Sequence, residues 1–317
     1  MVRSSSRFAP PFVPLIAGAF ALSLCVVGSI RAGEPEPAAD DEALRVMSFN
    51  IRTGAARDGE NAWPRRKDFV AETVLAFAPD VLGTQETHGF QRDDLSKRLP
   101  GYAAFGVGRD DGREGGEMMA VFYRTDRLKK LDGGHFWLSE TPDEPGSKSW
   151  DSSLPRLCTW LKLEDRRADG AGVFWLFNTH FDHRGRRARA NSATLLREKI
   201  AAIAGDGPAI LTGDFNASPG GEPYRNLFGE AGGGARLRDS YQERHPDEVR
   251  GENLGTAGGF RREDRGESRI DWIAVTPGWT ILDAAIDRTN RDGRTPSDHD
   301  PVTAILQRDR TAAAPGE

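Results

Sequence analysis

The sequence predicts a mixed α/β fold that is rich in β-strands. Two segments, 63–77 and 190–203, have the apolar spacing that is typical of helices. Shorter apolar segments of strand length, each bounded by Gly, Pro, Asp or Asn, lie around them at 44–50, 80–86, 118–123, 173–180, 209–216, 270–275 and 302–306. A chain of 317 residues with 38% hydrophobic residues can bury the core of one large domain of this kind.

The expected elements are supported by local signals in chain order. The first strand should begin at Leu44, where apolar residues replace an acidic stretch. The first helix has Pro64 near its start and carries Phe69, Thr73 and Phe77 at intervals of four. The later strands follow without an internal repeat in the sequence. One domain is therefore predicted over residues 44–308.

The N-terminal segment has the composition of a secretory signal. Arg3 and Arg7 precede an apolar run from Phe12 to Ile30, and the small residue Ala32 follows it. We therefore expect residues 1–32 to direct export to the periplasm or the extracellular space and then to be removed. An uncleaved membrane anchor is the alternative, because the run approaches the ~20 residues that span a bilayer.

The other terminal features concern the cysteines and the polar ends. Cys25 leaves open a lipid attachment, although Leu24 is a poor neighbour for a lipidated cysteine. Cleavage near residue 32 would leave Cys158 alone, so that no disulfide could form within the chain. Residues 33–43 are acidic and are expected to form a linker, and residues 309–317 a flexible tail.

The charge of the chain limits its partners. A formal net charge of −5 argues against a protein that holds nucleic acid mainly by neutralising phosphates, and any contact with nucleic acid would have to be local. We expect a monomer, with no stable membrane partner once the signal is removed.

Polar side chains follow four of the predicted strands at the point where each strand ends. These side chains are Asn50, Glu86, His180, and Asp214 with Asn216. A strand that is apolar until its tip delivers such groups to one edge of a sheet, where α/β scaffolds gather catalytic residues. One Asn or Asp there is explained equally well as a turn residue, but four such ends together indicate a site.

Six segments carry motifs in a fixed order: RVMSFNIR (45–52), DVLGTQET (80–87), FNTHFDH (177–183), ILTGDFNASP (210–219), RIDWIAV (269–275) and PSDHDPV (296–302). Their order and spacing resemble the endonuclease/exonuclease/phosphatase superfamily, in a bacterial branch. The resemblance implies a four-layer α/β sandwich of two packed, largely antiparallel sheets flanked by helices. It also implies a hydrolase that cleaves phosphoesters with Mg²⁺ or Mn²⁺, but it does not select the substrate.

The resemblance also implies roles for the metal-binding residues. Glu86 matches the principal metal carboxylate, Asp298 a second and supporting ligand, and Asn50 an uncharged group that assists the metal or a phosphate oxygen. Carboxylate and amide oxygens are the hard ligands that Mg²⁺ and Mn²⁺ prefer.

The remaining matches concern the reacting groups. Asp214 resembles the group that deprotonates or orients the attacking water, and Asn216 the group that fixes the water or the phosphate. His299 matches the histidine that contacts the scissile phosphate, and Asp271 the carboxylate that holds its other ring nitrogen. The alternative for Asp271 is an ion pair with Arg269.

His180 matches a position that is histidine in deoxyribonuclease-like members and tyrosine in abasic-site endonucleases. Glu117 resembles the carboxylate that supports this histidine, which would let His180 act as a general acid. We therefore expect an enzyme that is not primarily an abasic-site repair endonuclease.

Weaker candidates lie near these motifs. Trp150 and Arg156 could line the substrate pocket, and Arg184, in a basic cluster with Arg186, Arg187 and Arg189, could bind substrate phosphates. Packing of Arg156 and solvation of the cluster are the alternatives. A zinc site of His180, Asp182 and His183 is not favoured, because strand alternation places only two of the three on one face.

Two other functions compete with a general phosphoester hydrolase. The first is a secreted nonspecific nuclease. The second is a catalytically inactive binding module on the same fold. The inactive module is disfavoured because every matched motif position carries a residue of the competent type, whereas an inactive relative would be expected to have lost at least one.

Overall fold

The computed structural model describes residues 43–167, 172–229, 233–251 and 254–309. The predicted signal at 1–32 with Cys25, nearly all of the predicted linker at 33–43 and the tail after residue 309 lie outside these residues. No helix in the described part of the chain is long and apolar enough to cross a membrane.

Twelve strands form two sheets of six strands among the described residues. The first sheet has the order β11 (Trp279–Ile286), β12 (Val302–Arg308), β1 (Leu44–Asn50), β2 (Val81–Gln85), β4 (Val121–Arg124), β3 (Tyr102–Phe105). The second has the order β5 (Leu128–Trp137), β6 (Leu157–Asp165), β7 (Val173–His180), β8 (Ala209–Asp214), β10 (Asp271–Val275), β9 (Arg238–Asp239). Their inner faces share one apolar core, which includes Val46 and Val81 from the first sheet and Leu176 and Ile210 from the second.

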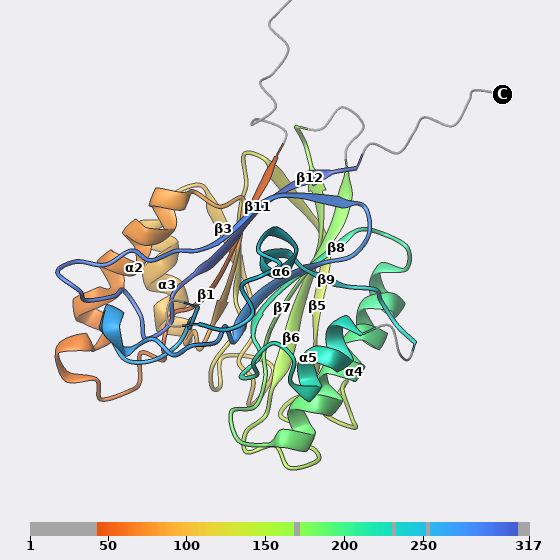
Figure 1. Ribbon diagram of the computed structural model, residues 1–317, viewed down its shortest axis with the longest axis horizontal. Coiled ribbons are helices and arrows are strands. Elements are labelled where there is room, and N and C mark those ends of the chain that lie inside the picture. The colour runs from red at the N-terminus through yellow and green to blue at the C-terminus, as the bar shows by residue number, and fades with distance from the viewer. Residues whose placement is uncertain (1–42, 168–171, 230–232, 252–253, 310–317) are drawn as a thin grey trace, which may run out of the picture. The chain divides into compact units, whose positions relative to one another are not determined.

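Helices cover the outer face of each sheet (Figure 1). α2 (Trp63–Phe77) and α3 (Gly89–Arg98) pack on the first sheet, and α4 (Arg186–Ala204) and α5 (Glu222–Phe228) pack on the second. The short elements are η1 (Gly59–Asn61), α6 (Ser240–Arg244) and η2 (Arg262–Asp264). The two sheets and their helical covers confirm the predicted four-layer α/β sandwich.

Each sheet contains one parallel pair, and all other neighbouring strands are antiparallel, which confirms the largely antiparallel character. β1 and β2 are parallel and are connected through α2, and β7 and β8 are parallel and are connected through α4. Because parallel strands end on the same side, the register places Asn50 opposite Gln85 and His180 opposite Asp214.

A buried polar contact joins the two sheets just below these strand ends. The Gln85 amide donates to Asn178 Oδ1 at 2.7 Å, and Thr212 Oγ1 donates to the same oxygen at 3.0 Å. Glycine is required at position 83, since a Cβ there would lie 2.2 Å from Thr212 Oγ1 and 2.6 Å from Asn178 Oδ1. The contact fixes how the two sheets meet beneath the polar edge.

Candidate active site

The polar strand ends of both sheets meet at one edge. Asn50 ends β1, and Glu86 follows β2 in a left-handed conformation with φ 58°. Asp214 ends β8, and Asn216 follows it with φ 47°. Left-handed backbone is unfavourable for a residue with a side chain unless the surroundings impose it, and it is common at functional sites. Both turns thus aim polar side chains over the ends of the sheets.

The carboxylate of Glu86 is held by two donors. Its Oε1 accepts from Asn50 Nδ2 at 3.1 Å, and its Oε2 accepts from the Thr53 N–H at 2.8 Å. Burial opposes ionisation, but the positive charge of His299 and these hydrogen bonds outweigh it and lower the pKa of Glu86 below its usual value. Glu86 is therefore a fixed anion in the site.

The side chain of Asn50 is held by contacts to both sheets. Its side-chain oxygen accepts from the Arg52 N–H at 3.0 Å, because the chain turns back there with φ 57°. Its nitrogen faces Glu86 and also donates to Asp214 Oδ2 at 3.0 Å. Asn50 is thus a donor that links a carboxylate of each sheet, and its role beside the metal or a phosphate oxygen stays a prediction.

Asp298 lies near Glu86 and completes an acidic pair. Burial first, and then the negative charge of Glu86, raise the pKa of Asp298 above its usual value. Arg52 lies 3.5 Å away through Nη1 and offsets part of this repulsion. Two neighbouring carboxylates that repel each other fit a hard divalent cation, which would relieve the repulsion. Glu86 and Asp298 therefore have the donor chemistry that the predicted Mg²⁺ or Mn²⁺ requires.

Asp214 occupies the centre of the site. It is buried, its Oδ1 accepts from the Asn216 N–H at 2.9 Å, and its Oδ2 lies 3.3 Å from His180 Nε2 and 3.8 Å from His299 Nε2. Burial first, and then the charge of Asp271, raise the pKa of Asp214 to about 7. The carboxylate is held in position with contacts on both oxygens.

His299 and Asp271 form the predicted contact. His299 Nδ1 lies 2.9 Å from Asp271 Oδ2, so Nε2 is directed toward Asp214. Burial opposes protonation of His299, but the charges of Asp271 and Asp214 outweigh it and raise its pKa well above the usual value. The alternative pairing of Asp271 with Arg269 is excluded, because Arg269 forms an ion pair with Asp239 at 3.0 Å.

These three residues also form a candidate cation cluster. Within the described ranges, the ligand atoms of Asp214, Asp271 and His299 lie within 4.8 Å of one another. His299 Nδ1 and Asp271 Oδ2 already contact each other at 2.9 Å within this cluster. The acidic pair of Glu86 and Asp298 and this cluster are therefore two candidate places for a cation.

His180 and Glu117 do not form the predicted contact. The Glu117 carboxylate accepts from Arg109 Nη1 at 2.5 Å, because the Arg109 N–H pairs with the Glu117 carbonyl and places the side chains together. His180 Nε2 lies 2.9 Å from Asn216 Nδ2, and His180 Nδ1 has no hydrogen-bond partner in the described part of the chain. Burial first, and then the charge of Arg156, lower the pKa of His180 well below its usual value. The predicted contact with Glu117 is therefore absent, and the general-acid role of His180 stays a prediction.

The two candidate arginines have different environments. Arg156 is 4% exposed and donates from Nη2 to His183 Nδ1 at 3.0 Å, so it lies against the His180 side of the site. Arg184 is exposed, and its N–H donates to Asp182 at 3.0 Å. Asp182 accepts four hydrogen bonds from its own loops, which leaves no zinc set with His180 and His183.

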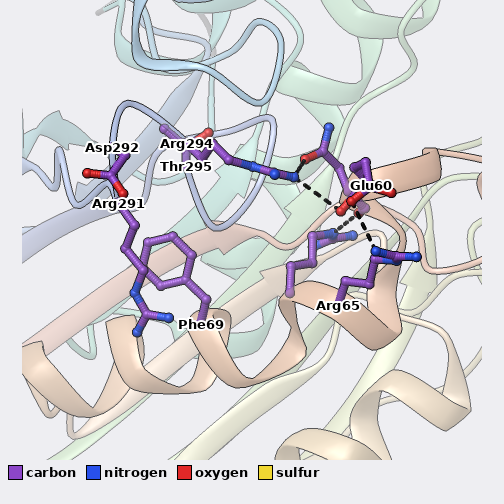
Figure 2. Close-up of a pocket in the computed structure, with 9 residues that line it drawn as sticks. Glu60, Arg65, Phe69, Arg291, Asp292, Arg294 and Thr295 are labelled. Atoms are coloured by element: carbon purple, nitrogen blue, oxygen red, sulfur yellow. Dashed lines mark hydrogen bonds and ion pairs between the residues drawn. The ribbon is translucent and has the colours of Figure 1, made fainter.

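An open pocket of about 360 Å³ is lined by nine residues, none of which is a predicted site residue. Figure 2 shows Arg291 beside Phe69 at one end, at 4.1 Å from the ring centre, and Glu60, Arg65 and Arg294 at the other. The buried Arg66 connects this pocket to the site by donating to Ile51 O at 2.6 Å.

Two residues of this site were missed in the sequence. Arg52 stands in the first motif beside Asn50, and Arg109 lies in the segment 105–112. Each contacts a predicted residue, Asp298 and Glu117 respectively. A motif position identifies a residue type at a strand end, but not which arginine folds back from a neighbouring loop to pair with it.

Fold and site together define the class of a phosphoesterase: two packed sheets whose common edge carries an acidic pair, a buried Asp–His–Asp cluster and arginines. The chain belongs to the Endonuclease/Exonuclease/phosphatase family, whose model matches residues 47–299.

Similar proteins agree with this assignment. A structure of an endonuclease/exonuclease/phosphatase family protein from Bacteroides thetaiotaomicron is 38% identical, covers 84% of this chain and 98% of its own, and has a TM-score of 0.76. A mannosyl-6-phosphatase from the same organism is also 38% identical, covers 83% and 99%, and has a TM-score of 0.74. The uncharacterized protein L388 of Acanthamoeba polyphaga mimivirus is 28% identical over 55% of this chain and 67% of its own length. The match spans only 31% of the nocturnin of Drosophila melanogaster.

Proposed function

We propose that this protein hydrolyses phosphoesters with a bound Mg²⁺ or Mn²⁺, and that the substrate is a phosphorylated sugar. The observation that carries the reaction is the meeting of the Glu86–Asp298 pair with the Asp214–His299–Asp271 cluster at one edge. The sugar is supported by 38% identity to a mannosyl-6-phosphatase over 83% of this chain. A net charge of −5 favours a small phosphoester over nucleic acid.

The site residues have distinct roles in this proposal. Asp214 accepts a proton from the attacking water, and its orientation is fixed by the Asn216 N–H and the Asn50 amide. His299 stabilises negative charge on the phosphoryl oxygens, with Asp271 fixing its ring. A divalent cation held by Glu86 and Asp298 would neutralise further charge on those oxygens.

The test is a substrate panel with purified protein in Mg²⁺ or Mn²⁺. The panel contains sugar 6-phosphates, nucleotides, plasmid DNA, RNA, abasic duplex DNA and phospholipids, with a Glu86→Gln variant as the inactive control. We expect the highest kcat/KM on a sugar phosphate. Preference for plasmid DNA would favour the secreted nuclease, preference for abasic duplex would contradict our expectation for His180, and no turnover would favour the binding module.

We further propose that the protein is exported after removal of residues 1–32 and acts as a monomer. The charged, apolar and small residues of this segment support the proposal. Intact-mass measurement on protein from the cell envelope fraction should give an N-terminus near residue 33, and light scattering should give the mass of one chain. A retained apolar segment would indicate the membrane anchor instead.

A further inference from the structure

Arg156 is a buried cation whose hydrogen-bonding capacity is only partly used. It directly precedes β6, is 4% exposed, and has one hydrogen bond, from Nη2 to His183. Its Nε and Nη1 have no hydrogen-bond partner among the described residues. A buried donor without a partner is unfavourable, so two such nitrogens on one guanidinium call for a ligand.

The nearest carboxylate does not satisfy these donors. Asp182 Oδ2 lies 3.6 Å from Arg156 Nε, beyond a hydrogen bond. The oxygens of Asp182 accept from four groups of neighbouring loops: the Ser153 hydroxyl and the N–H groups of Leu154, Arg184 and Gly185. Asp182 therefore fixes the loops around Arg156, and the guanidinium keeps donors for an external anion.

Two more unpaired nitrogens lie on the same side of the site. They are Nε of Arg109 and Nδ1 of His180, neither of which has a hydrogen-bond partner in the described segments. Arg109 is anchored through Nη1 to Glu117 at 2.5 Å, and His180 through Nε2, 3.3 Å from Asp214 and 2.9 Å from Asn216 Nδ2. With the Asn216 nitrogen as the donor in this contact, the proton of a neutral His180 lies on Nδ1. Three chain segments thus bring unpaired nitrogens near one another, because the charges of Arg156 and Arg109 both act on His180.

We propose that Arg156, with Arg109 and His180, binds the oxygens of a terminal phosphoryl group and makes the site selective for phosphomonoesters. A monoester has three non-bridging oxygens and a second negative charge near neutral pH, whereas a diester has two such oxygens and one charge. A guanidinium with two free donors matches a pair of phosphoryl oxygens. The inference rests on the proposed function and specifies which phosphoester the site takes.

The kinetic test compares two esters with one leaving group, 4-nitrophenyl phosphate and methyl 4-nitrophenyl phosphate. Arg156→Gln should lower kcat/KM on the monoester about 10²-fold and on the diester less than about 3-fold, because only the monoester fills all the donors. Arg156→Lys should recover part of the loss, since it keeps the charge without the planar fork. Arg250→Gln, at a side chain that is 74% exposed, is the control for losing one positive charge. Equal losses on both esters, or none, would overturn the proposal.

A binding test separates this inference from the proposed function. Calorimetric titration with inorganic phosphate and with dimethyl phosphate needs no turnover. The wild-type protein should bind inorganic phosphate more tightly, and Arg156→Gln should lose at least ~10-fold in that affinity with an unchanged thermal midpoint. Failure to hydrolyse any ester, with this binding difference intact, would reject the proposed reaction and keep the subsite. Hydrolysis with phosphate binding that is insensitive to Arg156→Gln and Arg156→Lys would reject the subsite and keep the reaction.

Discussion

The two sheets share one layout and present different chemistry at their common edge. In each, the third and fourth strands in the sheet order are parallel and are joined by a helix, α2 in the first and α4 in the second. In each, a residue just after the parallel pair has a left-handed backbone, Glu86 after β2 and Asn216 after β8. The sequence contains no repeat that announces this correspondence.

The difference lies in the groups that surround each strand end. Beside β1 and β2, the carboxylates of Glu86 and Asp298 repel each other and suit a cation. Beside β7 and β8, unpaired nitrogens of His180 and Arg156 suit an anion. Asn50 joins the two sides through its hydrogen bond to Asp214. The same strand geometry therefore provides an acceptor side, whose carboxylate oxygens suit a cation, and a donor side, whose nitrogens suit an anion. The two sides together match a metal-bound phosphate.

Removal of the acceptor side should have the largest effect. Glu86→Gln keeps the shape of the side chain but removes its charge, so kcat should fall at least ~10²-fold and activation by Mg²⁺ should weaken. Activity is measured against Mg²⁺ concentration, with Glu60→Gln, at a side chain that is 71% exposed, as the control. Full activity of Glu86→Gln in the presence of a chelator would contradict the assignment of a cation to this side.

The cluster between the two sides should respond as one unit. Asp271→Ala and His299→Ala should each lower kcat/KM about 10²-fold, and the double variant should lose little more, because Asp271 acts by holding His299. The measurement is a double-mutant cycle of kcat/KM. A parallel cycle of His299→Ala with Asp132→Ala, in the exposed part of β5, should be additive. Additive losses in the first cycle would show that Asp271 and His299 work independently.

The sequence predicted the strands that lead to the site better than those that do not. All seven predicted strands correspond to observed ones, including β1 and β7 with the same boundaries, because they are apolar and buried along most of their length. The other five strands, β3, β5, β6, β9 and β11, were missed; four of them lie at sheet edges, and β6 is an inner strand. Their polar residues interrupt the apolar pattern on which the prediction depends.

The site was predictable in its residue types and less so in its contacts. The pairing of His299 with Asp271 follows from two motifs and is present at 2.9 Å. The pairing of Glu117 with Arg109 was not predicted, since a buried carboxylate takes the cation that its own loop brings closest. The unpaired donors of Arg156 could not be predicted either, because burial and the lack of partners are properties of the folded chain.

Removal of His180 should have a moderate effect that tests the donor side. A neutral imidazole that donates from Nδ1 to a phosphoryl oxygen contributes binding to the phosphate, whatever the leaving group. His180→Ala should then lower kcat/KM about 10-fold on both an alkyl and an aryl phosphomonoester. A general acid would instead make the alkyl ester, which has the poorer leaving group, lose far more. A markedly larger loss on the alkyl ester would restore the general-acid role and contradict the neutral donor.

The smallest expected effect concerns the packing between the two sheets away from the site. His135 in β5 stacks on Phe105 in β3 with 4.9 Å between ring centres, so it joins the edge strands of the two sheets. Burial first, and then the charge of Lys130, lower the pKa of His135 to about 4, below the ~6.5 of an unfolded histidine. Between these values the unfolded chain binds more protons than the folded one, so acidification destabilises the fold.

His135→Gln removes this titration and retains a polar group for Thr159, whose hydroxyl lies 3.1 Å from His135 Nδ1. Between pH 6.5 and 4.5, the free energy of unfolding of the wild-type protein should fall by about 1 to 2 kcal/mol more than that of the variant. Urea denaturation at several pH values measures the difference, and kcat/KM at pH 7.5 should be the same for both. Parallel pH profiles of stability for the wild-type protein and the variant would show that His135 is not buried between the sheets. A change in kcat/KM at pH 7.5 would show that the packing of these edge strands affects the active site, so that the stability of this region and the activity are coupled.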